Sequence, residues 1–480
     1  MLPCAVAAAA FVVYALTISS GPAWDDSGEL TAGVARLGIV HQTGYPLYVL
    51  LGKAFVSVDP FAGDAARVSL WSAVAAAIAV GFIAWYVLAV SGSVVGAVMA
   101  ALVLATGPLF WYQAATASVY PLFVLSLAAL VVSTRLWRTD PRARNLAFVA
   151  VSAAAVFLSH NTGLVFVAGT GAFLVANRRL FRRASDLLPL AAGLIPLVSI
   201  AYLPLRDGYR GFPNLLAAQH ASVLEWLFGS GPGAPTLFGA SKHGLAVHAG
   251  RLVLLVAASL GPLALVLAPL GAVWLRRVSE YLWCCLLPAL AVAALVLTTA
   301  QSFAYWQFPL LVAAAIATGV VLPRVVSALR RRGALGIAAL AAVVVSFALV
   351  PALGAAYLAR GDRDALPWAR ASLAALPPGA QVVAPWRVYA PLRGLQALGD
   401  LRRDVALVEG PPTVQPASLA ALRGRYVVVV GARPPTAPPG VTLQQIGRPT
   451  RVNFKGLTGL GLGALRIGYP DERAYLFRVV

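Results

Sequence analysis

Charged side chains are scarce in this sequence, and acidic ones most of all. Asp, Glu, Lys and Arg make up 11% of the 480 residues, and only 17 residues are Asp or Glu. Soluble globular domains carry roughly 25% charged residues, so this composition excludes an ordinary soluble protein. Hydrophobic residues account for 60% of the chain, and a share this large indicates a protein that is surrounded by lipid.

Cysteine is also rare, and the basic residues are not concentrated in one region. Cys4, Cys284 and Cys285 are too few for a disulfide framework, and we interpret them as small buried apolar residues. The net charge is +20, yet Lys and Arg occur in short runs between apolar stretches. This distribution argues against a nucleic-acid partner and favours basic loops on the cytoplasmic side of a membrane. There is no phosphate-binding Gly-rich loop and no His or Cys metal-ligand cluster.

Long apolar runs dominate the first three quarters of the chain. A membrane-spanning helix needs about 20 mostly apolar residues. Eleven such windows lie near residues 2–20, 68–90, 94–110, 118–136, 145–160, 163–177, 187–205, 250–275, 281–299, 304–323 and 334–356. Arg-rich turns follow the fourth, sixth, eighth and tenth windows. By the positive-inside rule, this predicts a multi-pass cell-membrane protein with a cytoplasmic N-terminus and an extracytoplasmic C-terminal segment.

The last quarter of the chain has a different composition. Pro-rich linkers separate short apolar segments that are typical of buried strands, with helical stretches between them. These segments lie near residues 381–384, 405–408, 426–430 and 474–480. We therefore predict a helical membrane domain over residues 1–356, with long outer loops at 21–67 and 206–248. A small extracytoplasmic α/β domain follows over residues 357–480.

A cluster of carboxylates follows the first apolar window. Asp25, Asp26 and Glu29 lie within one hexapeptide of a chain that has few acidic residues. Ionisable groups beside a bilayer are costly unless they are paired or hydrated, so this cluster is a candidate functional site. A structural interpretation is that Asp26 or Ser27 caps a helix and Glu29 completes a capping box. The two interpretations are compatible, because carboxylates three residues apart at one helix end point into the same cleft.

The residues around this cluster resemble a known family. The motif Asp-Ser-Gly-Glu at 26–29 and the motif His-x-x-Gly-Tyr-Pro-Leu at 41–47 resemble the signature of the protein O-mannosyltransferase-like family of GT-C membrane glycosyltransferases. Further similar stretches lie at residues 66–73, 110–114, 119–120, 202–206, 376–380 and 401–405. The chain departs from the family at Gln42-Thr43, where Pro-Pro is usual. It departs again at Ser118, where an acidic residue is usual, and this change puts one substrate contact in doubt.

The resemblance implies an inverting transfer of a hexose, mannose by analogy, from a polyprenyl-phosphate carrier to a protein or glycan acceptor outside the cytoplasm. A phosphate leaves as a stabilised anion, so the reaction needs one carboxylate to accept the proton of the attacking hydroxyl. Asp26 aligns with the Asp of the motif and is the expected base. Glu29 would orient the acceptor or a cation, and Asp25 would raise the pKa of a neighbouring carboxylate. The lipid-linked donor is the only expected cofactor, and a divalent cation remains an open alternative.

Basic and polar outer residues complete the predicted site. Arg206, which matches the family's Tyr-Leu-Pro-Leu-Arg, is expected to contact the carrier phosphate. The other candidate substrate contacts are Arg67, Lys53, His41, Tyr45 and His160. Each also has a structural interpretation, as an interfacial anchor, a turn residue or a helix cap.

Two other classes of protein would share many of these features. A transporter or flippase for a lipid-linked sugar would also have many helices and outer carboxylates. Transporters usually carry ionisable groups at mid-membrane and repeated halves, and neither is evident in this sequence. A catalytically inactive scaffold would keep the fold and dispense with Asp26. We therefore favour a glycosyltransferase whose partners are membrane lipid, a polyprenyl-phosphate sugar and an acceptor.

Overall fold

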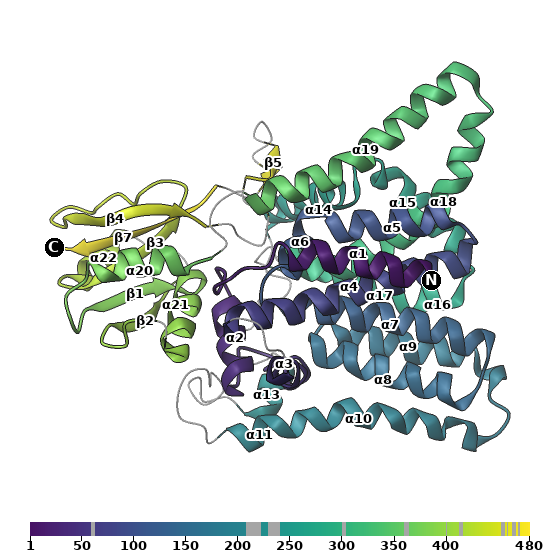
Figure 1. The fold of residues 1–480 in the computed structure, drawn as a ribbon, viewed down its shortest axis with the longest axis horizontal. Helices are drawn as coiled ribbons and strands as arrows, with labels where there is room; N and C mark the ends of the chain where they lie inside the picture. The colour runs from purple at the N-terminus through teal and green to yellow at the C-terminus, as the bar shows by residue number, and fades with distance from the viewer. Residues whose placement is uncertain are drawn as a thin grey trace.

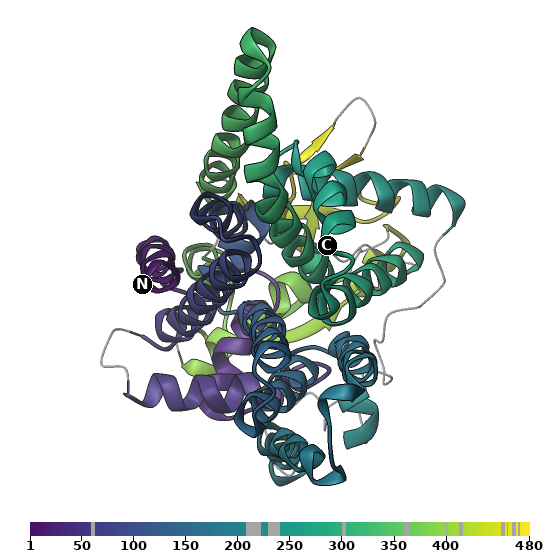
Figure 2. The same cartoon turned by 90° about the vertical axis from the view of Figure 1, so that its right-hand side faces the viewer.

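The structure is a computed structural model in which a long helical bundle carries a small β-sheet at one end (Figure 1). It describes residues 1–58, 63–207, 222–228, 241–299, 304–359, 364–399, 401–411, 416–452, 457, 459–462, 467–468 and 471–480. The N-terminus lies at the end of the bundle away from the sheet (Figure 1). Figure 2 looks along the bundle from that end and shows most of its helices nearly end-on.

Within the described residues, six helices are long and apolar enough to cross a membrane. They are α4 (Asp64–Ser91), α7 (Tyr120–Thr139), the continuous helical segment Ala184–Arg206, the segment Ser279–Thr298, α18 (Phe308–Arg330), and Leu335–Leu358 within α19 (Gly333–Ala359). Four shorter apolar helices accompany them: α1 (Leu2–Ala15), α3 (Pro46–Val58), α8 (Ala143–Ser159) and α9 (Gly163–Ala176). The chain is thus a multi-pass membrane protein.

Two of the segments above consist of several short elements. The segment Ala184–Arg206 contains η2 (Ala184–Gly193), α10 (Leu194–Leu197), η3 (Val198–Ala201) and α11 (Tyr202–Arg206). The segment Ser279–Thr298 contains α16 (Ser279–Tyr281), η4 (Leu282–Leu286) and α17 (Leu287–Thr298). Short elements elsewhere are η1 (Arg178–Leu180), α13 (Val223–Phe228) and η5 (Ala304–Gln307).

All eleven predicted windows coincide with helix, but two of them are not straight. The window at 94–110 divides into α5 (Val94–Thr106) and α6 (Pro108–Ala114), which meet at 70°. The window at 250–275 divides into α14 (Lys242–Leu260) and α15 (Ala264–Leu275), which meet at 88°. In both cases a Gly-Pro pair stands at the bend, because proline starts a new helix and cannot continue the preceding one.

The outer surface of the bundle is apolar, as expected for a protein in contact with lipid. Leu188, Leu194 and Ile195 are all more than half exposed. The prediction that the cysteines are buried is confirmed for Cys284 and Cys285 and is wrong for Cys4, which is exposed on α1. The hairpin of α18 and α19 projects beyond the other helices in both views (Figures 1 and 2).

The C-terminal sheet has five strands in the order β2-β1-β3-β7-β4. The strands are β1 (Gln381–Pro385), β2 (Ala406–Gly410), β3 (Tyr426–Gly431), β4 (Leu443–Arg451) and β7 (Arg473–Val479). The strands β2, β1 and β3 are parallel, whereas β7 is antiparallel to both β3 and β4. The remaining elements are α20 (Leu366–Ala374), α21 (Trp386–Leu398), α22 (Pro416–Leu419), η6 (Ala420–Leu422), β5 (Gly461–Leu462) and β6 (Ile467–Gly468).

The four predicted strands are all present, with two corrections. The strand at 405–408 was expected to be buried, but β2 is the edge of the sheet and much of it is exposed. The strand β4 was missed, because its polar residues Gln444, Gln445 and Arg448 give it no apolar run. The first outer loop contains α2 (Ser27–Arg36), which lies between the bundle and the sheet (Figure 1).

Candidate active site at the start of helix α2

The acidic motif forms the beginning of α2, but it does not cap the helix. Asp26 occupies the N-cap position, and its side chain makes no capping hydrogen bond. Asp25 has a positive φ of 70° and is mostly buried, and its backbone N–H donates to the carbonyl of Arg387. The predicted capping box is wrong, because both carboxylate oxygens of Glu29 accept hydrogen bonds from His41 instead.

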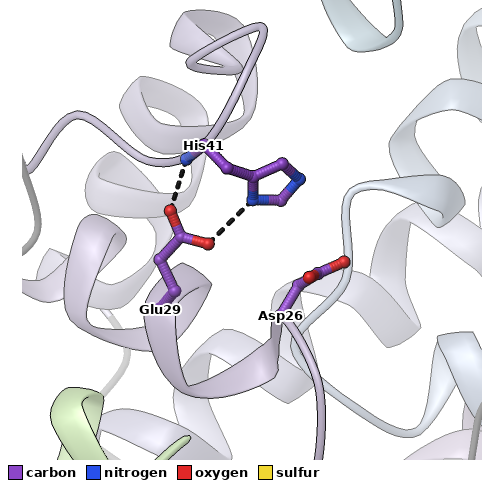
Figure 3. Close-up of side chains that lie close together, drawn as sticks. All are labelled: Asp26, Glu29 and His41. Carbon is purple, nitrogen blue, oxygen red and sulfur yellow. Dashed lines mark hydrogen bonds and ion pairs between the residues drawn. The ribbon is translucent and has the colours of Figure 1, made fainter. Parts of the chain in front are cut away.

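Glu29 and His41 form a buried pair. Glu29 is 0% exposed, and its Oε2 lies 2.7 Å from Nδ1 of His41, while its Oε1 accepts the backbone N–H of His41 (Figure 3). Burial raises the pKa of Glu29, and the histidine partly opposes this shift. Because one carboxylate binds both the backbone and the ring of His41, the orientation of the imidazole is fixed.

Asp26 lies beside this pair and remains partly exposed. Its Oδ1 accepts a hydrogen bond of 2.8 Å from Nε1 of Trp386, at the beginning of α21. The ligand atoms of Asp26, Glu29 and His41 all lie within 4.8 Å of one another (Figure 3). Carboxylate oxygens and imidazole nitrogens are ligands that divalent metal ions use. No metal-ligand cluster was predicted from the sequence, because these three residues come together only through the fold.

The C-terminal sheet domain packs directly against α2. A Cβ atom added to Gly28 would lie 2.2 Å from Cα of Pro391, and one added to Gly394 would lie 2.3 Å from the carbonyl oxygen of Gly28. The backbones of α2 and α21 therefore touch, and glycine is required on both sides. The ring of Trp24, just before the motif, packs edge-on against Trp368, with centroids 5.5 Å apart.

A small cavity separates the acidic residues from the turn between α6 and α7. Its volume is about 20 Å³, and Asp25 and Asp26 line one side of it. The other side includes Tyr112, Ser118 and Tyr120. A cavity of this size holds a water molecule, so a sugar needs this space to widen. Ser118, where the family usually has an acid, thus lines the same cavity as the carboxylates.

His41 and Tyr45 belong to the cluster, whereas two of the predicted cations do not. Tyr45 is buried, with its ring edge-on to His41 at 5.2 Å, and burial raises its pKa, as do the charges of Asp26 and Glu29. Nε of Arg206 donates to the carbonyl of Leu37, and Nζ of Lys53 donates to that of Ala35, each at 2.8 Å. Both therefore hold the C-terminal end of α2, a helix about 15 Å long.

His160 and Arg67 occupy different surroundings. His160 is buried at the end of α8, where Nδ1 lies 2.8 Å from Oγ1 of Thr162. Its ring packs 5.7 Å from that of Tyr120, so it stands behind the cavity wall rather than in the cavity. Arg67 is half-buried in the first turn of α4. Most of the second outer loop, residues 208–221 and 229–240, lies outside the described residues.

The sheet domain also contributes residues to the site, and none of them was predicted from the sequence. Trp386 begins α21, and the ring of Tyr389 lies 6.0 Å from its ring. Glu409 on β2 also faces this region: burial raises its pKa, and the charge of Glu29 raises it further. One feature of the chain could have identified Trp386 as a candidate. Trp386 follows directly after β1, and functional residues often lie at the carboxyl ends of parallel strands.

Comparisons with known proteins identify a family that is similar to the N-terminal part of this chain. Residues 26–181 match the family described as the protein O-mannosyl-transferase TMEM260 N-terminal domain. The mouse (Mus musculus) protein O-mannosyl-transferase TMEM260 is 36% identical over 131 residues, which cover 27% of this chain and 19% of the mouse protein. The predicted resemblance to the protein O-mannosyltransferase-like family is therefore confirmed, in a segment that begins at Asp26.

The whole fold is also similar to solved structures. ArnT from Cupriavidus metallidurans bound to undecaprenyl phosphate aligns with a TM-score of 0.53 and 12% identity, covering 99% of this chain and 97% of ArnT. The apo state of the same protein aligns over the same shares, with a TM-score of 0.52 and 13% identity. This likeness confirms the predicted GT-C fold with its small C-terminal α/β domain.

Proposed function

We propose that this GT-C protein, similar in its N-terminal third to the protein O-mannosyltransferases, is an inverting glycosyltransferase. It moves a hexose from a polyprenyl-phosphate carrier to a hydroxyl of a protein or glycan acceptor outside the cytoplasm. The observation that carries the proposal is the partly exposed Asp26 carboxylate beside the buried Glu29–His41 pair, at the sheet end of the bundle. The carrier class is supported by ArnT, which was solved with undecaprenyl phosphate.

The proposed reaction is a single displacement at the anomeric carbon. The acceptor oxygen attacks this carbon from the face opposite the phosphate, and Asp26 takes the hydroxyl proton. The bond between the anomeric carbon and the phosphate oxygen breaks, and its electron pair leaves with the phosphate. The phosphate is a stable anion, so no general acid is needed, and one displacement inverts the configuration. Asp26 suits the role better than Glu29, whose oxygens are both bonded to His41.

His41 and the outer cations would stabilise the carrier phosphate. The imidazole held by Glu29 is half-buried and, when protonated, brings positive charge next to Asp26. Asp26, Glu29 and His41 also fit a divalent cation, which would supply positive charge for the same phosphate. Arg67, Arg206 and Lys53 would attract the anionic headgroup to this rim of the bundle, while the last two hold the end of α2.

We further propose that the sheet end of the bundle is extracytoplasmic. The ends of α7, α9 and α15 are followed or marked by Arg138, Arg178 and Arg276, and they meet at α16, where Glu280 pairs with Arg138 and Ser279 bonds to Asn177. Helix α16 lies at the end of the bundle opposite the sheet, together with the N-terminus (Figure 1). Basic residues concentrate on the cytoplasmic side of membrane proteins. This orientation supports a cytoplasmic N-terminus and an extracytoplasmic domain over residues 357–480.

The test is a transfer assay with the full chain in proteoliposomes. The donors are polyprenyl-phosphate mannose and other radiolabelled polyprenyl-phosphate hexoses, and a cell-envelope extract supplies acceptors. Asp26→Asn is expected to lower the initial rate by at least about 100-fold, which is the low end for loss of a general base. Asp140→Asn is the matched control, because this carboxylate pairs with Arg142 at the other end of the bundle. Equal rates for both variants, or sugar that crosses the bilayer without covalent transfer, would refute the proposal.

A further inference from the structure

We propose that Trp386 positions the carboxylate of Asp26, so that the sheet domain is part of the catalytic centre rather than a separate acceptor-binding module. This inference rests on the proposed role of Asp26 as the base. The two residues are 360 positions apart in the chain and meet through one hydrogen bond of 2.8 Å.

The contact has the geometry of a positioning interaction. The indole N–H is a donor only, and it meets Oδ1 of Asp26. Asp26 makes no capping bond to its own helix, so its side chain is oriented from outside α2. A donor that holds one oxygen fixes the direction of the whole carboxylate group.

Three further contacts hold helix α21, which begins at Trp386. The carbonyl of Arg387 accepts the backbone N–H of Asp25 at 2.9 Å, which ties the first turn of α21 to the residue before Asp26. The side chain of Arg387 pairs with Glu472, next to strand β7. Around these bonds, the glycine contact between α2 and α21 leaves no room for the helices to slide. Movement of the sheet domain would therefore be transmitted directly to Asp26.

The aromatic rings around Trp386 are also consistent with a packing role, which an experiment has to distinguish from the positioning of Asp26. Its indole lies 6.3 Å from the ring of His41 and 6.0 Å from that of Tyr389, so it also fills the space between the two parts of the chain. A packing role depends on the shape of the indole, whereas positioning depends on its N–H. A substitution that changes the N–H alone distinguishes them.

The kinetic experiment compares two substitutions at this residue. Trp386→Phe removes the donor and part of the ring, while 3-benzothienylalanine at position 386 replaces the N–H by sulfur and keeps the ring shape. Both are expected to lower kcat about tenfold, the effect of losing one hydrogen bond to a charged group. The KM for the polyprenyl-phosphate donor should stay within about twofold, because a base acts on the acceptor proton. The matched control is Trp274→Phe, in the last turn of α15, where the ring lies under the guanidinium of Arg324 and away from Asp26.

The outcomes separate this inference from the proposed function. Wild-type kcat in the benzothienylalanine protein would overturn the positioning role and leave the transfer activity standing. No transfer by the wild-type protein would refute the proposed function. In that case thermal unfolding of Trp386→Phe, Asp26→Asn and the double variant still tests the contact. Non-additive losses in Tm would support it, and additive losses would refute it.

Discussion

Replacing Gly28 by alanine is expected to separate α2 from α21 and to disable the site without touching a reactive group. The new Cβ would lie 2.2 Å from Cα of Pro391 and 2.8 Å from the carbonyl oxygen of Ala390. Ordinary contacts begin at 3.4 Å, so the two backbones must move apart by about 1.2 Å, the difference between 3.4 and 2.2 Å. The obstacle is main chain on both sides, so no side-chain rotation relieves it.

Gly28→Ala should lower both the stability of the protein and its transfer rate. Overpacking of this kind costs about 1–3 kcal/mol of stability, which a lower Tm in proteoliposomes or nanodiscs would report. A displacement of about 1 Å in the catalytic geometry typically costs on the order of 100-fold in rate, so transfer should fall far more than the loss of folded protein explains. The rate is measured at a temperature where the variant is fully folded.

Gly171→Ala provides the matched control for this experiment. Gly171 lies within α9, and a Cβ there would meet no atom within 4 Å. Alanine is the better helix former, so this variant should keep both its rate and its Tm. If Gly28→Ala transferred sugar at the wild-type rate with an unchanged Tm, the two backbones would not be in contact and the reasoning would fail.

Two further predictions concern buried carboxylates. Burial raises the pKa of Glu29 above 4.5. The folded protein therefore binds the carboxyl proton of Glu29 more tightly than the unfolded chain does. The free energy of unfolding should fall as the pH rises from 4.5 through the raised pKa. Glu29→Gln should flatten that part of a Tm-against-pH curve, and an identical slope in both proteins would contradict the assignment. Glu280 is fully buried between Arg135 and Arg138 at the far end of the bundle. Glu280→Ala removes the partner of both cations and should lower the free energy of unfolding by about 3 kcal/mol. Denaturant unfolding measures this loss, and a loss no larger than that of Asp140→Asn would show that the pairing is not stabilising.

Local composition was sufficient to predict most of the architecture. The length and number of apolar runs predicted the helices, and runs such as Tyr426–Gly431 predicted strands, because burial in lipid or in a sheet requires consecutive apolar residues. Where the residues that form an element are polar, as in β4, no such signal exists. The bends after α5 and α14 were missed because an apolar window records hydropathy and not direction.

The candidate site was predicted only in part. The acidic motif stood out because carboxylates are rare in this chain, and the motifs at 26–29 and 41–47 indicated Asp26, Glu29 and His41 as separate candidates. Local spacing was equally consistent with a capping box for Glu29, but in the structure this carboxylate accepts hydrogen bonds from His41 instead. Arg206 was expected to meet a phosphate, and its Nε is bonded to the end of α2.

By itself, then, the sequence determined a many-helix membrane protein with an outer carboxylate motif and a small sheet domain, because those properties depend on residues close together in the chain. Only the tertiary structure decided which groups surround Asp26. The approach of Gly28 to Gly394 brings Trp386 to that carboxylate from 360 residues away. Such an approach depends on how two distant backbones fit together, and neither hydropathy nor spacing along the chain carries that information.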